Sequence, residues 1–439
     1  MKKSKKKFVL AGLVLLAITM VLLPLSGCKN DTVPPEVEKQ EQEDGGGSET
    51  DKNDTVPETP KNLVTFDVGG NREAKAPKPI TVESGTELTA EQVPELSDTS
   101  SYQFMGWYLG DTEIKAGYTV TEPVTVTARW QGWLTFTAEG EQSLIIEETG
   151  DMQIPDSMEY STDGGKIWYK PEVGTPISFG NGTKLYLRAK SSIGTGEFPG
   201  EHLVFQFETE VKVACSGDIR TLVDYTNPTG ADTANARFCY LFATCSQLTQ
   251  APKLPAEILA DHCYYEMFAG CTSLTQAPEL PAKALADHCY YDMFARCIRL
   301  TQAPELLAEN LADSCYYGMF SGCTSLTEAP ELPAKALADN CYEGMFYGCT
   351  SLTEAPELPA ETLANFCYAD MFYGCENLNS VTMLATDVSA SDALYQWLPD
   401  TPREGTLYVA NEEMTTDPTI FGSVPSPLKY WKIAVATTN

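Results

Sequence analysis

The sequence predicts a multidomain chain in which two β modules precede an α/β repeat solenoid. Three observations lead to this fold class. The chain has 439 residues, which is too long for one ordinary core. Short apolar runs separated by glycine and proline turns occupy residues 62–211, as is typical of β-strands. A cysteine then recurs every 26 residues from Cys245 to Cys375, which indicates a stacked repeat.

The composition argues against several classes of function. Lys and Arg number 30 against 61 Asp and Glu, and the net charge of −31 repels phosphate backbones, so we expect no nucleic-acid partner. The sequence contains no G-x-S-x-G, H-E-x-x-H or P-loop motif. His262 and His288 share a repeat position that holds Ser314, Asn340 or Phe366 in later units. We therefore expect neither an enzyme nor a cofactor or metal site.

The first 27 residues have the layout of an export signal. Five lysines, at positions 2, 3, 5, 6 and 7, precede an uncharged apolar run, residues 8–23, that is short for a membrane span. The following L-S-G-C, ending at Cys28, resembles the lipobox of bacterial lipoproteins. That resemblance implies cleavage before Cys28, lipidation of Cys28 and an exported protein anchored to a bacterial membrane, with the outer membrane or cell surface favoured. The alternative is an uncleaved anchor helix, and the sequence leaves the choice of membrane open.

Residues 28–61 form the next segment. They are acidic, contain no aromatic residue and include the run Gly-Gly-Gly-Ser, so they cannot bury enough surface to fold. We expect a disordered tether that holds the folded part of the chain away from the membrane.

Residues 62–130 are predicted to form a small β module. The runs VTFDVGG, YQFMGWYL and VTVTARW resemble the internalin B-repeat of bacterial surface proteins. The resemblance implies a β-grasp-like fold that serves as a spacer. Four aromatic residues, Phe66, Phe104, Trp107 and Trp130, are the expected core.

Residues 131–211 continue with regularly spaced apolar runs and turn signals, which predict a β-sandwich-like module. The segment from Ser161 to Trp168 resembles the Asp-box of sialidases. In that family the box braces a hairpin, with Asp163 in the turn and the tryptophan packed beneath it. A single copy does not make a sialidase propeller. The alternative function is carbohydrate binding by this module, through Trp168 and Tyr169.

Residues 212–400 are predicted to form the solenoid with its N-terminal cap. In each unit the apolar positions step by three and then change to helical spacing, so we expect a short strand and a helical turn per unit. We interpret the first cysteine column as a buried structural ladder. Its members are Cys245, Cys271, Cys297, Cys323, Cys349 and Cys375. Export also permits disulfides, such as Cys263 with Cys271, and the sequence does not decide between the two.

The pattern F-x-x-C-x-x-L followed by L-P closely resembles the BspA-like leucine-rich repeats of bacterial surface proteins. The resemblance implies a horseshoe solenoid with strands on its concave side. It also implies adhesion to a protein ligand, either a host matrix protein or a protein on another cell. Residues 401–439 are expected to form the C-terminal cap.

The outward positions of the predicted concave strands form columns of threonine, glutamine and glutamate. We predict that these residues bind the partner: Thr275, Gln276, Glu279, Thr301, Gln302, Glu305, Thr327, Glu328, Glu331, Thr353, Glu354 and Glu357. Their chemistry favours a basic or hydroxyl-rich partner. The alternative is a solvated face that keeps the solenoid soluble. The tyrosines of the opposite side, from Tyr264 to Tyr342, are a competing surface.

Overall fold

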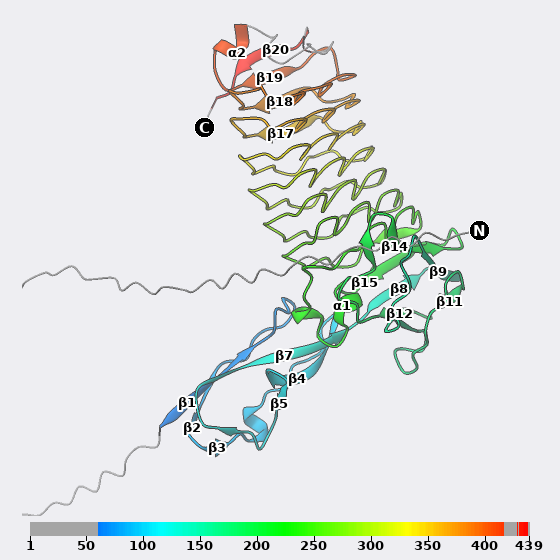
Figure 1. Ribbon diagram of the computed structural model, residues 1–439, viewed down its shortest axis with the longest axis vertical. Helices are drawn as coiled ribbons and strands as arrows, with labels where there is room; N and C mark the ends of the chain where they lie inside the picture. Colours follow the sequence, from blue (N-terminus) through cyan, green and yellow to red (C-terminus); the bar gives the residue numbers. More distant parts are fainter. Residues whose placement is uncertain (1–59, 417–427, 429, 438–439) are drawn as a thin grey trace, which may run out of the picture. The chain divides into compact units, whose positions relative to one another are not determined.

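The computed structural model describes residues 60–416, 428 and 430–437. The predicted signal peptide, Cys28 and nearly all of the tether lie outside these residues. In the described part, strands in several sheets dominate and helices are few. The helical elements are α1 (Thr221–Asp224), α2 (Glu413–Thr416) and two single 3₁₀ turns, η1 (Ala90–Gln92) and η2 (Pro228–Gly230). The fold is that of a β-rich repeat protein (Figure 1).

The first described sheet has five strands in the order β2-β1-β7-β4-β5. Strands β1 and β7 run parallel and the other neighbours antiparallel. The strand bounds are β1 (Lys61–Asp67), β2 (Ile80–Glu83), β4 (Tyr102–Leu109), β5 (Thr112–Ile114) and β7 (Val124–Gly132). A separate two-stranded ribbon pairs β3 (Thr86–Glu87) with β6 (Thr119–Val120).

The aromatic residues predicted as the core of this sheet do pack together. Trp107 and Trp130 are 1% and 0% exposed. Phe66 packs against Trp107 with ring centroids 4.9 Å apart, and Phe104 contacts both tryptophans. The Trp130 indole donates a hydrogen bond to the Val68 carbonyl at 2.8 Å, so its polar atom is satisfied inside the core.

Two further sheets pack against each other after residue 132. One has the order β10-β12-β8-β15-β16 and the other β11-β9-β14-β13. Phe136 of β8 lies 6.1 Å from Phe205 of β14, which joins the inner faces of the two sheets. The bounds are β8 (Leu134–Ala138), β9 (Gln142–Glu148), β10 (Glu159–Ser161), β11 (Ile177–Phe179), β12 (Leu185–Arg188), β13 (Gly196–Phe198), β14 (Glu201–Phe207), β15 (Val213–Ser216) and β16 (Leu248–Gln250).

The sandwich continues directly into the repeat segment. Strand β15 pairs in parallel with β16, which belongs to the first unit of the array. One hydrophobic cluster runs without interruption from Leu134 to Trp431. The sandwich therefore covers the apolar end of the array, as the terminus of a stacked repeat requires.

Each 26-residue unit folds into one coil, and successive coils lie beside one another (Figure 1). Isolated parallel bridges join Gln276 to Gln302 and Gln302 to Glu328, where the sequence predicted the strand of each unit. In the last units these bridges widen into a parallel sheet in the order β17-β18-β19-β20. Its strands are β17 (Glu354–Leu358), β18 (Ser380–Met383), β19 (Thr406–Val409) and β20 (Lys432–Val435).

The predicted helical turn of each unit is wrong, because a run of turns stands in its place. Left-handed φ values recur at every fourth residue, as at His262 (60°), Glu266 (48°) and Gly270 (74°), and such residues end a right-handed helix. Backbone N–H groups then bond alternately within a coil and to the next coil. Tyr265 donates to the His262 carbonyl at 3.2 Å, and Glu266 donates to the Tyr291 carbonyl of the next coil at 2.8 Å.

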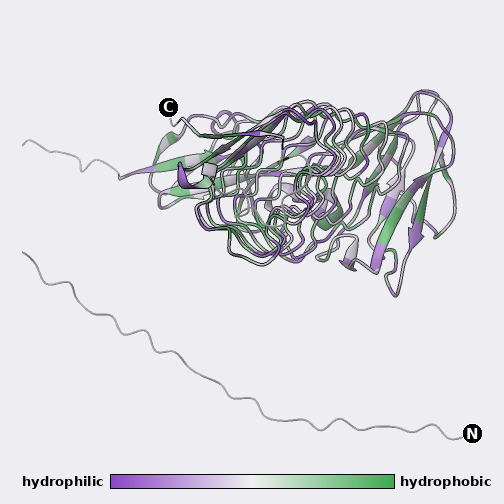
Figure 2. Cartoon of the chain, turned by 90° about the horizontal axis from the view of Figure 1, so that it is seen from above, coloured by the Kyte–Doolittle hydropathy of each residue, from purple (hydrophilic) through white to green (hydrophobic). Residues whose placement is uncertain are grey.

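Identical side chains stack from coil to coil through the interior. The phenylalanine column has ring centroids 5.5 to 5.9 Å apart and consists of Phe242, Phe268, Phe294, Phe320, Phe346 and Phe372. Each of these rings is at most 1% exposed. Hydrophobic and hydrophilic stretches follow one another around the coils (Figure 2). No coil can bury its apolar side alone, so the stack itself supplies the core.

A buried polar cluster connects the first sheet to the segment that follows β15. Tyr102 of β4 donates a hydrogen bond to the Asp218 carboxylate, and Arg220 donates to the same carboxylate at 2.8 Å. Asp218 is fully buried. Nearby, burial favours protonation of Glu73, but hydrogen bonds from Lys253, Ser101 and Ser100 prevail and lower the pKa of Glu73 to about 2. These contacts fix the first sheet against the beginning of the array.

Candidate interaction surface

All twelve residues predicted to bind a partner are exposed, and each lies between buried leucines of its coil. Leu274 and Leu280 are 0% and 4% exposed, whereas Thr275, Gln276 and Glu279 between them face solvent. The same burial pattern recurs in the three following coils. It is not the strict alternation of a regular strand, because the adjacent Thr275 and Gln276 both face solvent and only an isolated bridge at Gln276 joins this segment to the next coil.

The coil-to-coil register brings equivalent residues of this surface together. Thr301 donates its backbone N–H to the Thr275 carbonyl at 3.3 Å, and its hydroxyl contacts the same oxygen at 3.4 Å. In the last of these coils, Glu354 pairs with Ser380 and Glu357 with Thr382 in the parallel ladder between β17 and β18. The predicted residues therefore form continuous columns, which we call the Thr/Glu face.

From Glu279 onward, one column of the Thr/Glu face is made only of carboxylates, whereas the preceding coil carries Lys253 at this position, paired with Glu73. Its members are Glu279, Glu305, Glu331 and Glu357. Among the ion pairs within 4.0 Å that the described part of the chain forms, none includes these four. Like charges on adjacent coils repel each other, and the repulsion is felt most at low ionic strength. These four carboxylates therefore have no ion-pair partner among the described residues, and Lys253 at the end of the column is paired with Glu73 instead.

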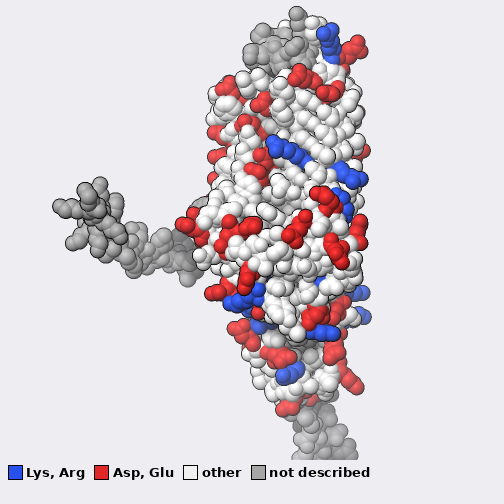
Figure 3. Space-filling model, turned by 90° about the vertical axis from the view of Figure 1, so that its right-hand side faces the viewer, with Lys and Arg blue, Asp and Glu red and all other residues white. Residues whose placement is uncertain are grey.

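The neighbouring charged column follows the opposite rule. Its sign alternates from coil to coil, through Glu257, Lys283, Glu309, Lys335 and Glu361. In this column each charge has a neighbour of opposite sign on the next coil, which favours the stack. Figure 3 shows one face of the molecule, on which carboxylates outnumber cationic side chains. The all-carboxylate column is therefore an electrostatic feature distinct from the overall negative charge.

The six cysteines of the predicted ladder are buried and point at backbone oxygens of the preceding coil. The thiols of Cys271, Cys297, Cys323, Cys349 and Cys375 each donate to a phenylalanine carbonyl at 3.1 to 3.2 Å, and Cys245 donates to the Phe205 carbonyl at 3.0 Å. Burial raises the pKa of Cys297 to about 12. The ladder is thus structural, and its thiols stay protonated.

No disulfide joins the described cysteines. All thirteen from Cys215 to Cys375 are free and buried, including Cys263 and Cys271, the pair that export would permit. A buried thiol that donates to a carbonyl behaves as a small apolar residue with one satisfied donor. The structure therefore favours the ladder over the disulfide alternative.

The tyrosines proposed as a competing surface divide into two groups. Tyr264, Tyr290, Tyr316 and Tyr342 are at most 2% exposed and stack in the interior. Tyr265, Tyr291 and Tyr317 are half-buried, and their rings stack at 4.6 and 4.3 Å. Their ring faces contact each other, so only ring edges remain for a partner. The sequence could not distinguish these groups, because a buried tyrosine and a half-buried tyrosine are adjacent residues in most of the coils.

A pair of carboxylates beside the tyrosine stack was not recognised from the sequence. Glu266 and Asp292 occupy the same position on adjacent coils. Burial, and then the proximity of Glu266, raises the pKa of Asp292 to about 7, and Arg296 partly opposes this shift. Asp292 lies over Gly318 of the next coil, which has no side chain to occupy that space. The signal in the sequence is that Gly318 stands at the repeat position where the two preceding coils carry Glu266 and Asp292.

The Asp-box-like segment braces its own loop. The Asp163 carboxylate accepts hydrogen bonds from the Ser161 hydroxyl at 2.8 Å and from the Ile167 N–H at 3.0 Å. Hydrogen bonds of this kind lower the pKa of Asp163. The Trp168 indole donates to the Gly165 carbonyl at 2.9 Å. These contacts are those expected of a hairpin brace.

The aromatic residues named for carbohydrate binding differ in exposure. The Arg188 guanidinium lies 3.7 Å from the Trp168 ring centroid, and Trp133 packs at 5.8 Å from Trp168. Tyr169 is 51% exposed. Stacking of a sugar on Trp168 would compete with Arg188. Carbohydrate binding therefore stays a prediction that depends mainly on Tyr169.

No protein-family model, no curated protein and no solved structure matches this chain. The described residues form a β-rich repeat protein with an exposed polar face on which four glutamates stand in one column on consecutive coils.

Proposed function

We propose that this chain is a lipid-anchored bacterial cell-surface protein whose repeats form a leucine-rich-repeat solenoid of the BspA-like kind. Its Thr/Glu face mediates adhesion by binding a protein of the host matrix or of another cell. The observation that carries the proposal is the column Glu279, Glu305, Glu331 and Glu357, four exposed carboxylates on consecutive coils, none of which forms an ion pair within 4.0 Å among the described residues.

The regular bonding between coils supports the solenoid. Backbone hydrogen bonds join equivalent positions on consecutive coils, as from Tyr264 to the Cys289 carbonyl and from Tyr290 to the Cys315 carbonyl. Each coil contacts its neighbours in the sequence through the stacked interior columns. Turns take the place of helices on the side opposite the Thr/Glu face, so a leucine-rich-repeat solenoid here has no helical layer.

The electrostatics of the Thr/Glu face support a cationic partner. Carboxylates arranged at regular intervals attract a basic partner at long range and fix its register on contact. A face that needed only to remain soluble could alternate its charges, as the neighbouring column from Glu257 to Glu361 does. The all-carboxylate column sacrifices stability, which is expected of a binding surface rather than of a solvated face.

The anchor and tether are proposals from the sequence. The lipobox-like L-S-G-C places lipid on Cys28, and residues 28–61 would separate the folded part of the chain from the membrane. None of the helices in the described ranges is long and apolar enough to cross a bilayer.

The test measures binding of the mature chain, with Cys28 replaced by serine, to immobilised matrix proteins in rising salt. We expect binding that weakens as salt screens the carboxylates. Replacing Glu279, Glu305, Glu331 and Glu357 together by glutamine should abolish it. Absence of binding to every matrix and cell-surface protein offered would contradict the proposal.

A matched control removes the same number of charges elsewhere. Glu83, Glu87, Glu91 and Glu122 are exposed residues of the first β module, and their replacement by glutamine changes the net charge equally. This control variant should bind as the unaltered chain does. If both quadruple variants lose binding to the same extent, then net charge rather than the Thr/Glu face determines the interaction.

A further inference from the structure

One coil departs from the repeat at an exposed position beside the Thr/Glu face. Leu307 stands where the other coils carry proline, at Pro255, Pro281, Pro333 and Pro359. Its side chain is 39% exposed. The two residues after Ala308, Glu309 and Asn310, replace a Lys-Ala pair that both neighbouring coils keep. Single exposed apolar side chains are common on protein surfaces, so Leu307 gains its interest from the hollow that it lines.

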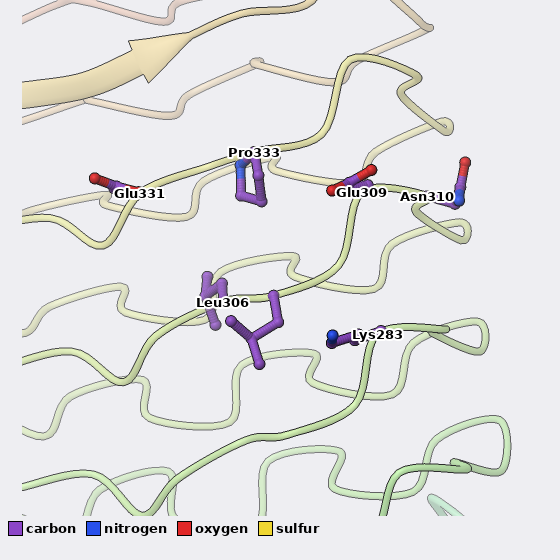
Figure 4. A pocket seen from close by; sticks show the side chains of 7 residues that line it. Lys283, Leu306, Glu309, Asn310, Glu331 and Pro333 are labelled. Carbon is purple, nitrogen blue, oxygen red and sulfur yellow. The ribbon is translucent and has the colours of Figure 1, made fainter.

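A hollow of about 490 Å³ opens at this coil. It spans three coils and is lined by Lys283, Leu306, Leu307, Glu309, Asn310, Glu331 and Pro333. Figure 4 shows Leu306 between the coil that carries Lys283 and the coil that carries Pro333. Glu331 lies on one side of the hollow and Glu309 on the other (Figure 4). The hollow therefore combines an apolar floor with a carboxylate at each side.

Glu331 belongs both to this hollow and to the all-carboxylate column. A ligand that enters the hollow is thus in line with Glu305 on one side and Glu357 on the other. Lys283 is the one cation in the lining, and it lies next to Glu309 in the column of alternating charges. The carboxylates that remain for a ligand outnumber the cations, so the complement is an apolar group with positive charges close to it.

We infer that this hollow is the anchor point of the Thr/Glu face: it takes one aliphatic or aromatic side chain of an extended basic polypeptide segment. Lysine or arginine residues flanking that side chain pair with Glu331 and with its neighbours in the column. This inference rests on the proposed function and names the partner class of the same face. A divalent cation would need the carboxylates but not Leu307, so the side-chain chemistry of the hollow separates the two.

The experiment uses the mature chain and two synthetic peptides. In the first peptide a central leucine is flanked by alternating threonine and lysine, and in the second a glycine replaces the leucine. We expect the leucine peptide to bind about tenfold more tightly, because partial burial of one leucine side chain is worth about one decade in affinity. The measurement is fluorescence anisotropy of labelled peptide at low and at physiological salt.

Two variants that restore the repeat consensus test the anchor directly. Leu307→Pro inserts the residue that the neighbouring coils carry at this position, and it should reduce the affinity of the leucine peptide to that of the glycine peptide. Ile298→Thr is the matched control: Ile298 is an exposed apolar residue of the same coil that replaces a threonine of its neighbours and does not line the hollow. It should keep the preference for leucine. An undiminished preference in Leu307→Pro would overturn the inference.

The two proposals fail in different ways. If both peptides bind equally and binding is lost when the four column glutamates become glutamine, the Thr/Glu face stands and the anchor is wrong. If neither peptide binds, and neither salt nor the quadruple variant changes binding of the chain to matrix proteins, both proposals are wrong. If calcium competes with the peptide and Leu307→Pro has no effect, the carboxylates serve a metal ion and the anchor is wrong.

Discussion

The thiol of Cys297 donates a hydrogen bond to the carbonyl oxygen of Phe268 at 3.2 Å, across the boundary between two coils. The same relationship recurs at Cys271, Cys323, Cys349 and Cys375, always to the phenylalanine 29 residues earlier. At the start of the array, Cys245 makes it to Phe205 of the sandwich. The cysteine column therefore ties each coil to the one before it, and the first coil to its cap.

Replacing one ladder cysteine by alanine should weaken the whole array. Cys323→Ala removes a buried thiol and its hydrogen bond to the Phe294 carbonyl, so we expect the free energy of unfolding to fall by about 1–2 kcal/mol. Chemical denaturation followed by circular dichroism measures this change. The control Thr327→Ala alters an exposed residue of the same coil and should change stability by less than about 0.5 kcal/mol. Equal stability of the two variants would contradict a structural role for the ladder.

Gly318 and Gly344 provide a matched pair at one repeat position. Both have a left-handed φ, 56° and 61°, so alanine at either site costs roughly 1–2 kcal/mol of backbone strain. A Cβ at Gly318 would also collide with the Asp292 carboxylate, whereas a Cβ at Gly344 would meet open space. We expect Gly318→Ala to be more destabilising than Gly344→Ala by about 1–3 kcal/mol in thermal denaturation.

A second background tests the cause of that difference. In a chain that carries Asp292→Gly, the collision is absent, so Gly318→Ala should cost no more than Gly344→Ala. If the excess cost of Gly318→Ala persists there, it does not come from contact with the Asp292 side chain.

Asp292 should make stability depend on pH in the neutral range. Its folded-state pKa of about 7 lies above the usual value of 3.8, because burial and then the neighbouring Glu266 disfavour the carboxylate. The folded state therefore holds a proton that the unfolded state releases, and the free energy of unfolding falls as pH rises from about 4 to about 7. Asp292→Asn stays neutral at every pH. At pH 8 we expect this variant to be more stable than the unaltered chain by about 2 kcal/mol, after allowance for partial solvent exposure.

The difference between the two proteins should become small at pH 4, where Asp292 is protonated in the folded state and about half protonated in the unfolded state. Urea denaturation at pH 4, 6 and 8 measures it. The control Glu122→Gln removes an exposed carboxylate of the first β module, away from the array, and should not reproduce this difference. A constant difference between Asp292→Asn and the unaltered chain across this range would show that packing, not ionisation, explains it.

Tyr102 should hold the first sheet to the array. Its hydroxyl donates to the buried Asp218 carboxylate, and burial together with that carboxylate raises the pKa of Tyr102. Tyr102→Phe leaves Asp218 with fewer donors in a buried site, so we expect a loss of about 1–3 kcal/mol. We also expect faster proteolysis near residue 132 in limited digestion. Tyr169→Phe, at an exposed ring, is the control, and a variant Tyr102→Phe that resists protease as the control does would contradict this role.

The repeat period, the buried cysteine column and the exposed Thr/Glu face could be predicted because they depend only on spacing. A residue that recurs every 26 positions must meet its own equivalents once the coils stack. The step of three from Leu274 through Ala277 to Leu280 then indicates which side chains turn inward and which face solvent. The aromatic core of the first module followed from the same kind of argument, since a small module has no aromatic residue to spare.

The helical turn of each unit could not be excluded from the sequence. Leu285, Cys289 and Met293 have helical spacing, and nothing local prevents a helix there. The helix is absent because left-handed residues such as His288 and Asp292 redirect alternate N–H groups to the next coil. This hydrogen bonding depends on a carbonyl 25 residues away in the chain, so helix propensity alone does not reveal it. Leu307 replaces a proline of the repeat, but only the structure shows that it lines the hollow.

The pairing of β15 with β16 has a consequence for how the protein can change over generations. The sandwich caps one end of the array and the β17-β18-β19-β20 sheet belongs to the other, so every internal coil has the same kind of neighbour on both sides. Loss or gain of one whole unit by recombination joins surfaces that already match. The molecule can therefore vary its reach and its number of glutamates in single steps without having to evolve new ends.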